Sequence, residues 1–382
     1  MKKMKRNLLP LLMAVLLVLT MSACGSSSSD DTSSSGDTET ASDTDTESSG
    51  EDLNSKTLDE IIADAQEEGE VNSVGMPDEW ADWASLWASL LDNYGIEHTD
   101  TDMSSSEELQ MFATEGENAT KDIGDIGYGF TAQAVEEDLV QAYQTSYWDS
   151  VPDWAKDDEG LWMVAYTGVT TFLVNTDQVD EVPTSWADLL EGDYKVALGP
   201  LTGGNAQAAF IASAYAFGGD MDNLEPAVEF WTTLAEEGRV STLDITQANF
   251  ESGEITVGVV WSFTGIPYSK NITQYTMEAV VPTDGCLQNG YASVINKYAP
   301  NANAAALARE IMFSDEGQTY LALAGALPTR EDFTIADEYA DEVISSEDTA
   351  DAVLIEDADL YSEACEEAQT VWEEEIAPLL VQ

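Results

Sequence analysis

Apolar residues in this chain recur with two different periods. Beyond residue 56, segments with apolar residues at helical spacing alternate with short, continuous apolar runs. Thr57 and Glu60 have the spacing of a capping box at the start of one helical segment, and Gly69 follows that segment, so a helix is expected between them. Residues 71–74 then predict a short strand. The repeated alternation predicts an α/β fold with mainly parallel strands, whose ligands bind at the carboxyl ends of the strands.

The next helix is expected to begin at Pro77 and Asp78. It contains Trp80, Trp83 and Trp87 at helical spacing, and such a stripe is typical of the helix side that faces a core. Trp83 and Trp87 are therefore expected in the core. Trp80, in the first turn beside the end of the strand, is a candidate ligand contact.

Two glycine-rich segments accompany further predicted elements. Residues 122–129 predict a strand that runs into a glycine-rich turn without the dinucleotide-binding fingerprint. Residues 199–205 precede a helix predicted over 205–216, and Asn205 stands where a nucleotide-hydrolysing phosphate loop has Lys. Nucleotide hydrolysis therefore has no support. The free backbone N–H groups at this helix start suit an anion, although the glycines are equally consistent with a plain turn.

The amino terminus predicts an export signal. A segment over 1–7 with four basic residues precedes an almost purely apolar run over 8–20. This run is shorter than the roughly 20 residues of a membrane-spanning helix, so 1–23 are expected to be a signal peptide. The run ends in Met-Ser-Ala-Cys, which resembles the lipobox of bacterial lipoproteins and makes Cys24 the candidate lipidated residue. Ser, Thr, Gly, Asp and Glu dominate the following residues, so 24–55 are expected to be a lipidated, disordered acidic linker.

Composition excludes several classes of function. The 382 residues contain 74 Asp+Glu against 13 Lys+Arg, a net charge of −61, which rules out nucleic-acid binding through a basic patch. A single histidine, His98, excludes multi-histidine metal sites and any Ser/His/Asp machinery not centred on it. Neither GxSxG nor HExxH is present, and no repeats indicate an adhesive protein. The spacing of Cys286 and Cys365 is compatible with a disulfide or with two buried thiols.

Several blocks resemble bacterial extracellular solute-binding proteins of ABC importers. They occur in the family's order and cover residues 168–179, 183–190, 250–259, 282–285, 291–297, 300–311, 314–318 and 325–330. Among them, 250–259 resembles the strand in which the chain re-crosses the hinge in that family, and 300–311 resembles its alanine-rich helix. Together the blocks span roughly residues 71–330.

The resemblance implies a two-lobed, type II periplasmic-binding-protein fold with a hinge and an interlobe cleft that closes on a ligand. Lobe 1 is then expected over 56–158 and 285–330, and lobe 2 over 159–284. An acidic helical segment over 331–382, with a helix over 363–376, is expected to pack on the lobes. No bond is made or broken in such a protein, so neither an enzyme nor a cofactor is expected.

The implied partners are a small-molecule ligand and a membrane permease with its cytoplasmic ATPase. The protein is expected to be a monomer, anchored through Cys24 to the extracellular face of the cell membrane, or in the periplasm if the cell has two membranes. A secreted α/β hydrolase and a ferric or other metal-ion binder remain as alternatives. Within the family, the chain most resembles the subgroup that includes ferric-ion, phosphosugar, phosphonate and polyamine binders. The iron binders of that subgroup use adjacent tyrosines, whereas Tyr268 here stands alone after Pro267, which argues against bare ferric iron and leaves no residue assigned to metal.

Two ligand classes stay open, and they require opposite chemistry. A polyamine needs carboxylates and aromatic faces, for which the candidates are Asp125, Tyr128, Trp261 and Asp284. A phosphorylated or other oxyanion solute needs hydroxyls and helix N-termini, for which the candidates are Gly203, Gly204, Asn205, Thr170 and Ser262. Met76 and Trp80 complete the ligand-binding set.

Overall fold

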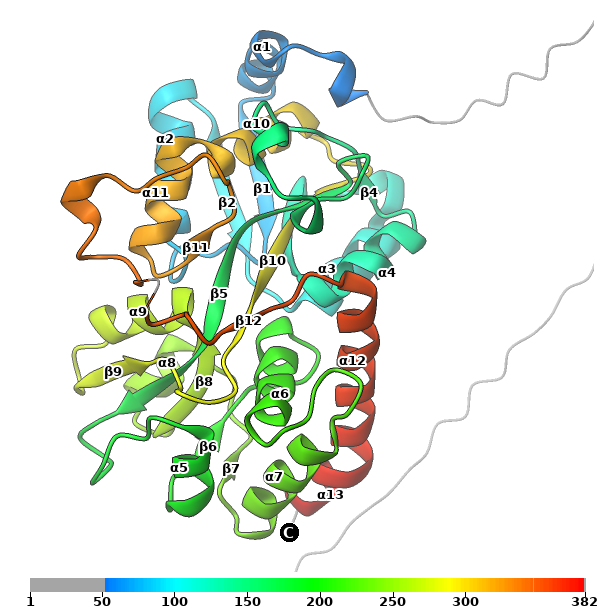
Figure 1. Ribbon diagram of the computed structural model, residues 1–382. Coiled ribbons are helices and arrows are strands. Elements are labelled where there is room, and N and C mark those ends of the chain that lie inside the picture. The colour runs from blue at the N-terminus through cyan, green and yellow to red at the C-terminus, as the bar shows by residue number, and fades with distance from the viewer. Residues whose placement is uncertain (1–51, 346, 381–382) are drawn as a thin grey trace, which may run out of the picture. The chain divides into compact units, whose positions relative to one another are not determined.

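The computed structural model describes residues 52–345 and 347–380 (Figure 1). The predicted signal peptide and the candidate lipidation site Cys24 lie outside these residues. Within the described part of the chain, no helix combines the length and apolarity that crossing a membrane requires.

One mixed sheet, ordered β2-β1-β3-β10-β5-β8-β6-β7, runs through the described residues (Figure 1). Its first half contains β1 (Glu70–Val74), β2 (Glu97–Thr101) and β3 (Ile123–Gly127), with β1 parallel to both neighbours. Its second half contains β6 (Val196–Ala197), β7 (Val240–Ser241) and β8 (Val257–Trp261), with β6 parallel to both neighbours. Parallel pairing therefore holds among these six strands, but the expectation of a mainly parallel sheet is wrong, because most pairings with the two long strands β5 and β10 are antiparallel.

Two long strands join the halves. The first part of β5 (Trp162–Asn175) pairs with β10 (Leu287–Asn296), and its last part pairs with β8; all these pairings are antiparallel. On its other edge, β10 pairs with β3 over Tyr291–Ile295, also antiparallel. The chain therefore enters the second half along β5 and returns along β10. The expectation that 250–259 re-cross the hinge is wrong, because β8 pairs only within the second half and with β5.

Short strands extend this sheet. They are β4 (Val140–Gln141), β9 (Met277–Val280), β11 (Leu327–Pro328) and β12 (Val353–Leu354). All fourteen residues of β5 are buried, which explains why this strand is a nearly continuous apolar run in the sequence.

The helices begin largely where local signals place them. Thr57 and Glu60 form the expected capping box of α1 and Gly69 ends that helix in the left-handed conformation, so this prediction is confirmed. The helices are α1 (Leu58–Glu68), α2 (Trp83–Tyr94), α3 (Ser105–Glu115), α4 (Thr131–Glu136), α5 (Trp186–Glu191), α6 (Gly204–Ala216), α7 (Glu225–Glu236), α8 (Gln247–Glu251), α9 (Ser262–Asn271), α10 (Ala302–Phe313), α11 (Asp315–Leu323), α12 (Ala358–Val371) and α13 (Ala377–Leu380).

Helix α2 begins later than expected. Ala81 and Asp82 have φ values of +52° and +54°, which a helix does not allow, so helical structure begins at Trp83 instead of Pro77. Trp80 consequently lies in a loop. Trp83 and Trp87 are buried in the core, as the stripe predicts.

The carboxyl-terminal helix contacts both halves of the molecule. It begins at Ala358, earlier than the predicted residue 363, and a π-helical turn over Trp372–Ile376 continues it. Ser362 Oγ donates to the Gly129 carbonyl at 2.9 Å just after β3, and α12 also packs along α6 (Figure 1). This helix therefore bridges the segment that follows the first-half strand β3 and the second-half helix α6. The sequence is compatible with a disulfide between Cys286 and Cys365 or with two buried thiols. In the structure both are free, buried thiols.

Candidate functional site

A cavity of about 700 Å³ lies where the carboxyl ends of β1, β2 and β3 face the starts of α6, α8 and α9. The first three elements belong to the first half of the sheet, and the helices belong to the second. Carboxyl ends of parallel strands meet at one edge of a sheet, so residues distant in sequence converge there. The cavity therefore occupies the edge at which a fold of this class binds its ligands.

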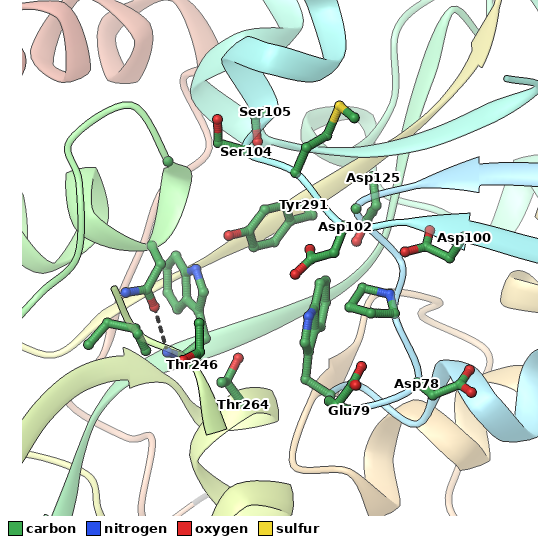
Figure 2. A pocket seen from close by; sticks show the side chains of 18 of the residues that line it. Asp78, Glu79, Asp100, Asp102, Ser104, Ser105, Asp125, Thr246, Thr264 and Tyr291 are labelled. Atoms are coloured by element: carbon green, nitrogen blue, oxygen red, sulfur yellow. Dashed lines mark hydrogen bonds between the residues drawn. The ribbon is translucent and has the colours of Figure 1, made fainter. Parts of the chain in front are cut away.

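Six carboxyl groups line this cavity. Asp78 and Glu79 follow β1, Asp100 and Asp102 lie at the end of β2, Asp125 lies in β3, and Glu108 lies in the first turn of α3. Figure 2 shows that Asp78, Glu79, Asp100, Asp102 and Asp125 gather on one side of the cavity, with Thr246 toward the other. None of the described residues that line it is Lys or Arg. The wall is therefore strongly acidic.

Burial disfavours the charged form of the two innermost carboxyls. Burial raises the pKa of Asp125 to about 8, while a 2.5 Å hydrogen bond from the Tyr166 hydroxyl lowers it and the charge of Asp100 raises it. Burial raises the pKa of Glu108 well above its usual range, and the charges of Asp125, Asp100 and Asp102 add to this effect. The two carboxyls therefore bind protons more tightly than ordinary acids.

Asp100 and Asp102 lie nearer the solvent. Asp100 Oδ1 accepts hydrogen bonds from Ser73 Oγ at 2.5 Å and from the Met76 backbone N–H at 3.1 Å, which fixes this carboxylate at the end of β2. Burial and then the charge of Asp100 raise the pKa of Asp102. Asp102 projects toward the middle of the cavity in Figure 2, which makes it the carboxylate best placed to meet a ligand.

The single histidine adds no positive charge. His98 stacks on Trp87 with ring centroids 3.7 Å apart, and one of its ring nitrogens lies 2.8 Å from Ser73 Oγ. Burial, with a smaller effect from the charge of Lys121, lowers the pKa of His98 to about 4. The ring is therefore neutral at pH 7.

Aromatic rings form another part of the wall. Trp80 lies 5.7 Å from Phe263 and 5.8 Å from Tyr291 between ring centroids, and Trp261 stacks on Phe263 at 5.9 Å. These rings come from the loop after β1, from β8 and α9, and from β10. Flat apolar faces beside carboxylates suit a ligand that carries positive charge on a hydrocarbon stem.

The start of α6 lies close to β3. A Cβ atom on Gly127 would lie 3.1 Å from the Gly204 Cα, so the two halves approach backbone to backbone here. Asn205 Oδ1 accepts from the Trp261 backbone N–H at 3.0 Å, and its Nδ2 donates to the Val259 carbonyl at 2.9 Å. Its side chain therefore secures the end of β8.

Residues 118–349 match a family described as bacterial extracellular solute-binding proteins. This chain belongs to that family. The family is non-enzymatic and serves ABC transport, so the expected class of function is confirmed at this level. A search of curated protein sequences finds no match to this solute-binding protein.

Solved structures share its type II periplasmic-binding-protein fold. AfuA from Actinobacillus pleuropneumoniae, with fructose-6-phosphate bound, is 19% identical with a TM-score of 0.61 and covers 80% of this chain and 98% of its own. Iron-bound HitA from Pseudomonas aeruginosa is 16% identical with a TM-score of 0.62 and covers 80% and 98%. The Atu4243-GABA receptor is 18% identical with a TM-score of 0.59 and covers 80% and 97%. At these identities the similarity shows the fold alone, which confirms the predicted fold class.

Six of the eleven residues proposed from the sequence line the cavity of this solute-binding protein. They are Trp80, Asp125, Gly203, Gly204, Asn205 and Trp261. Of the other five, Met76 is fully buried, and its carbonyl accepts from the Trp87 indole at 3.2 Å. The Tyr128 hydroxyl donates to the Trp154 carbonyl at 2.8 Å, away from the cavity lining.

Thr170, Ser262 and Asp284 also lie outside the cavity lining. The Thr170 hydroxyl donates to a carbonyl at the start of β10 at 3.4 Å. The Ser262 hydroxyl donates to the Gly325 carbonyl at 2.7 Å. Asp284 Oδ1 accepts from the Trp186 backbone N–H at 2.7 Å and so caps α5. Each of these side chains has a partner within the fold.

Sequence reasoning missed most of the acidic wall. Asp78 and Glu79 lie a few residues after the predicted strand over 71–74, which is a usable signal. Asp100 belongs to β2 and Asp102 directly follows it, but the polar sequence of this segment does not predict a strand. A search for acidic residues just after the ends of strands would have found these positions, because strand ends carry ligand contacts in this class of fold.

Proposed function

We propose that this solute-binding protein captures a small organic cation, an amine on an apolar stem such as a polyamine, and delivers it to an ABC importer permease. The observation that carries the proposal is the cavity wall, in which six carboxyl groups meet five aromatic side chains and none of the described lining residues is Lys or Arg. Ammonium groups hydrogen-bond to carboxylates, and aromatic faces attract both the charge and the methylene stem.

An oxyanion fits this wall poorly. At 4 Å, two like charges repel by roughly 4 kcal/mol at the effective dielectric constant of a partly buried site, and a phosphate would meet several such carboxylates. The start of α6 offers backbone N–H groups, but the Asn205 side chain is occupied by β8. The phosphorylated solute is therefore the weaker candidate.

A bare metal ion is also less well supported. In the two described ranges, no group of three or more His, Cys, Asp or Glu side chains is arranged to hold a metal ion. Tyr268 lines the cavity, but the residues beside it in sequence are Pro267 and Ser269. The carboxyls are spread along the wall, an arrangement that suits an extended ligand.

The proposal extends to the whole transport step. The two halves of the sheet act as the lobes, over 56–158 with 285–330 and over 159–284, and β5 and β10 act as the hinge. The exported monomer is held by a lipid on Cys24 at the outer face of the membrane, or in the periplasm of a cell with two membranes. The permease and its ATPase receive the ligand there.

A thermal-shift screen tests the ligand class. The purified protein is heated with putrescine, spermidine, γ-aminobutyric acid, fructose-6-phosphate and ferric citrate, and a ligand that binds only the folded state raises the melting temperature. We expect shifts with the amines and none with the phosphosugar. The variant Asp102→Asn should lose most of the shift, whereas Asp92→Asn, on the exposed side of α2, should keep it. A shift with fructose-6-phosphate alone would overturn the proposal.

A further inference from the structure

The carboxyl group of Glu108 lacks a hydrogen-bond partner on one oxygen. Glu108 is 1% exposed and borders the cavity from the first turn of α3. No group in the described residues forms a hydrogen bond with its Oε2, which is buried. A buried carboxyl oxygen without a partner is unfavourable, because folding removes its hydrogen bonds to water and provides no other hydrogen bond in their place.

Two glycines leave room for this carboxyl group. Gly75, at the end of β1, has φ +69°, and a Cβ atom there would overlap Glu108 Oε1. A Cβ atom on Gly124, in β3, would lie 2.9 Å from Glu108 Oε2. The ends of two neighbouring strands therefore combine to make space for an acid at the inner wall of the cavity.

A second buried acid lies beside it. Asp125 is 2% exposed, borders the same cavity, and accepts the Tyr166 hydroxyl on Oδ2 at 2.5 Å. Tyr166 is fully enclosed, and burial raises its pKa well above the usual range, so it acts as a neutral donor. This hydrogen bond occupies Oδ2 of Asp125. The other oxygen of Asp125 and the Glu108 carboxyl group remain for a positively charged group of a ligand.

The titratable groups around the pair are acids and phenols. Asp100 and Asp102 at the end of β2 raise the pKa of Glu108, as does Asp125. Tyr291 on β10 also faces both acids, and burial, reinforced by their charges, raises its pKa. His98, the basic residue in the cavity lining, is neutral at pH 7. Two buried carboxyls so close together cannot both ionise without a cation, so the ligand-free pair keeps at least one proton.

We propose that Glu108 and Asp125 form an ammonium subsite at the inner wall of the cavity, in which a primary ammonium group of the ligand replaces a proton held by the pair. The inference rests on the proposed function. The ammonium donates its N–H groups to Glu108 Oε2 and to Asp125, and the displaced proton leaves to the solvent. Charge is conserved at the subsite, because one positive charge enters as one leaves.

Proton exchange distinguishes this subsite from a carboxyl with only a structural role. Calorimetric titration of the purified protein with putrescine, spermidine and γ-aminobutyric acid at pH 7, in buffers of different ionisation enthalpy, counts the protons released. We expect release of up to one proton per ligand and an affinity that rises up to tenfold per pH unit between pH 6 and 8, since alkyl ammonium groups stay charged over this range.

The variant Glu108→Gln removes the exchangeable proton while keeping the shape of the side chain. We expect it to release clearly fewer protons, to bind at least tenfold more weakly at pH 8, and to show a flatter pH dependence. Glu67→Gln, on the exposed side of α1, is the matched control and should behave as the parent does. The proton count of the parent protein tests the subsite even if Glu108→Gln does not fold.

The outcomes separate the two proposals. An amine that binds without releasing a proton, with an affinity unchanged by Glu108→Gln, would overturn the subsite and leave the proposed function standing. If none of the three amines binds between pH 6 and 8 while the protein is folded, both proposals are wrong.

Discussion

The Tyr166 hydroxyl donates to Asp125 Oδ2 at 2.5 Å. This contact joins the crossing strand β5 to β3 at the inner wall of the cavity. Both residues are buried, so the hydrogen bond lies in an environment where it is electrostatically strong. It links the strand that connects the two halves of the sheet to the acid that we assign to the ligand.

Removing this hydroxyl should affect the acid and the fold together. A hydrogen bond to a carboxylate favours its charged form, so Tyr166→Phe should raise the pKa of Asp125 further above 8. The lost hydrogen bond should also lower the free energy of unfolding by about 1–3 kcal/mol, measured by urea denaturation. Amine binding at pH 7 should weaken, whereas Tyr339→Phe, in the C-terminal segment, should change neither quantity. An unchanged pH dependence of binding in Tyr166→Phe would contradict the assignment.

Trp80 supplies an aromatic face on the first-half side of the cavity. Replacing it by alanine removes contacts with Phe263 and Tyr291 as well as the surface offered to a cationic ligand. A desolvated cation–π contact contributes about 2 kcal/mol, so Trp80→Ala should weaken amine binding roughly 30-fold. Titration calorimetry measures this loss. Trp80→Phe should recover part of the affinity, and equal losses in both variants would argue against an aromatic contact with the ligand.

Asp125 should make stability depend on pH. Its pKa is about 8 in the folded protein and about 4 in the unfolded chain, so the folded state binds the proton more tightly between these values. The stabilisation is fully present below pH 4 and is lost as the pH rises toward 8. We therefore expect the parent to lose on the order of 2–4 kcal/mol more than Asp125→Asn between pH 5 and 8, by denaturant titration at each pH. Parallel curves for the two proteins would show that Asp125 ionises normally.

The two cysteines in the described residues should react slowly. Burial raises the pKa of the Cys286 thiol to about 12 and that of Cys365 still further, and the thiolate is the reactive form. In a Cys24→Ser chain, Ellman's reagent should modify both thiols only after denaturation, at a rate at least about 100-fold higher than in the native protein. Intact mass without reductant should show both thiols free. Rapid modification in native buffer would mean that α12 or the segment before β10 opens readily.

Much of this protein can be predicted from short sequence segments. The capping boxes of α1 and α3 depend on residues three positions apart. The helical spacing of the tryptophans in α2 predicts which side of that helix is buried. The order of the blocks that resemble the family was sufficient to predict the family and the fold. These features are encoded locally or in chain order, so one sequence suffices to infer them.

Two features could be located only from the structure: the start of α2 and the strand, β10, along which the chain returns to the first half. Proline and aspartate at residues 77 and 78 match a helix start, but the backbone at Ala81 and Asp82 turns left-handed, and the Ala81 N–H donates to the Phe263 carbonyl in the other half of the molecule at 3.0 Å. Likewise β8 has the sequence of a crossing strand, yet its pairing keeps it in the second half. Long-range hydrogen bonds decide both cases.

The sequence by itself therefore determined the class of protein and many of the elements from which it is built. The tertiary structure decided which acids share a site, because Asp78, Asp102, Glu108 and Asp125 come from four separate elements that meet only when parallel strands end at one edge of the sheet. In a chain with 74 acidic residues, composition cannot select these four. Burial distinguishes Glu108 and Asp125 from the other acids that line the cavity, since removal from water shifts their protonation, and burial is a property of the folded chain.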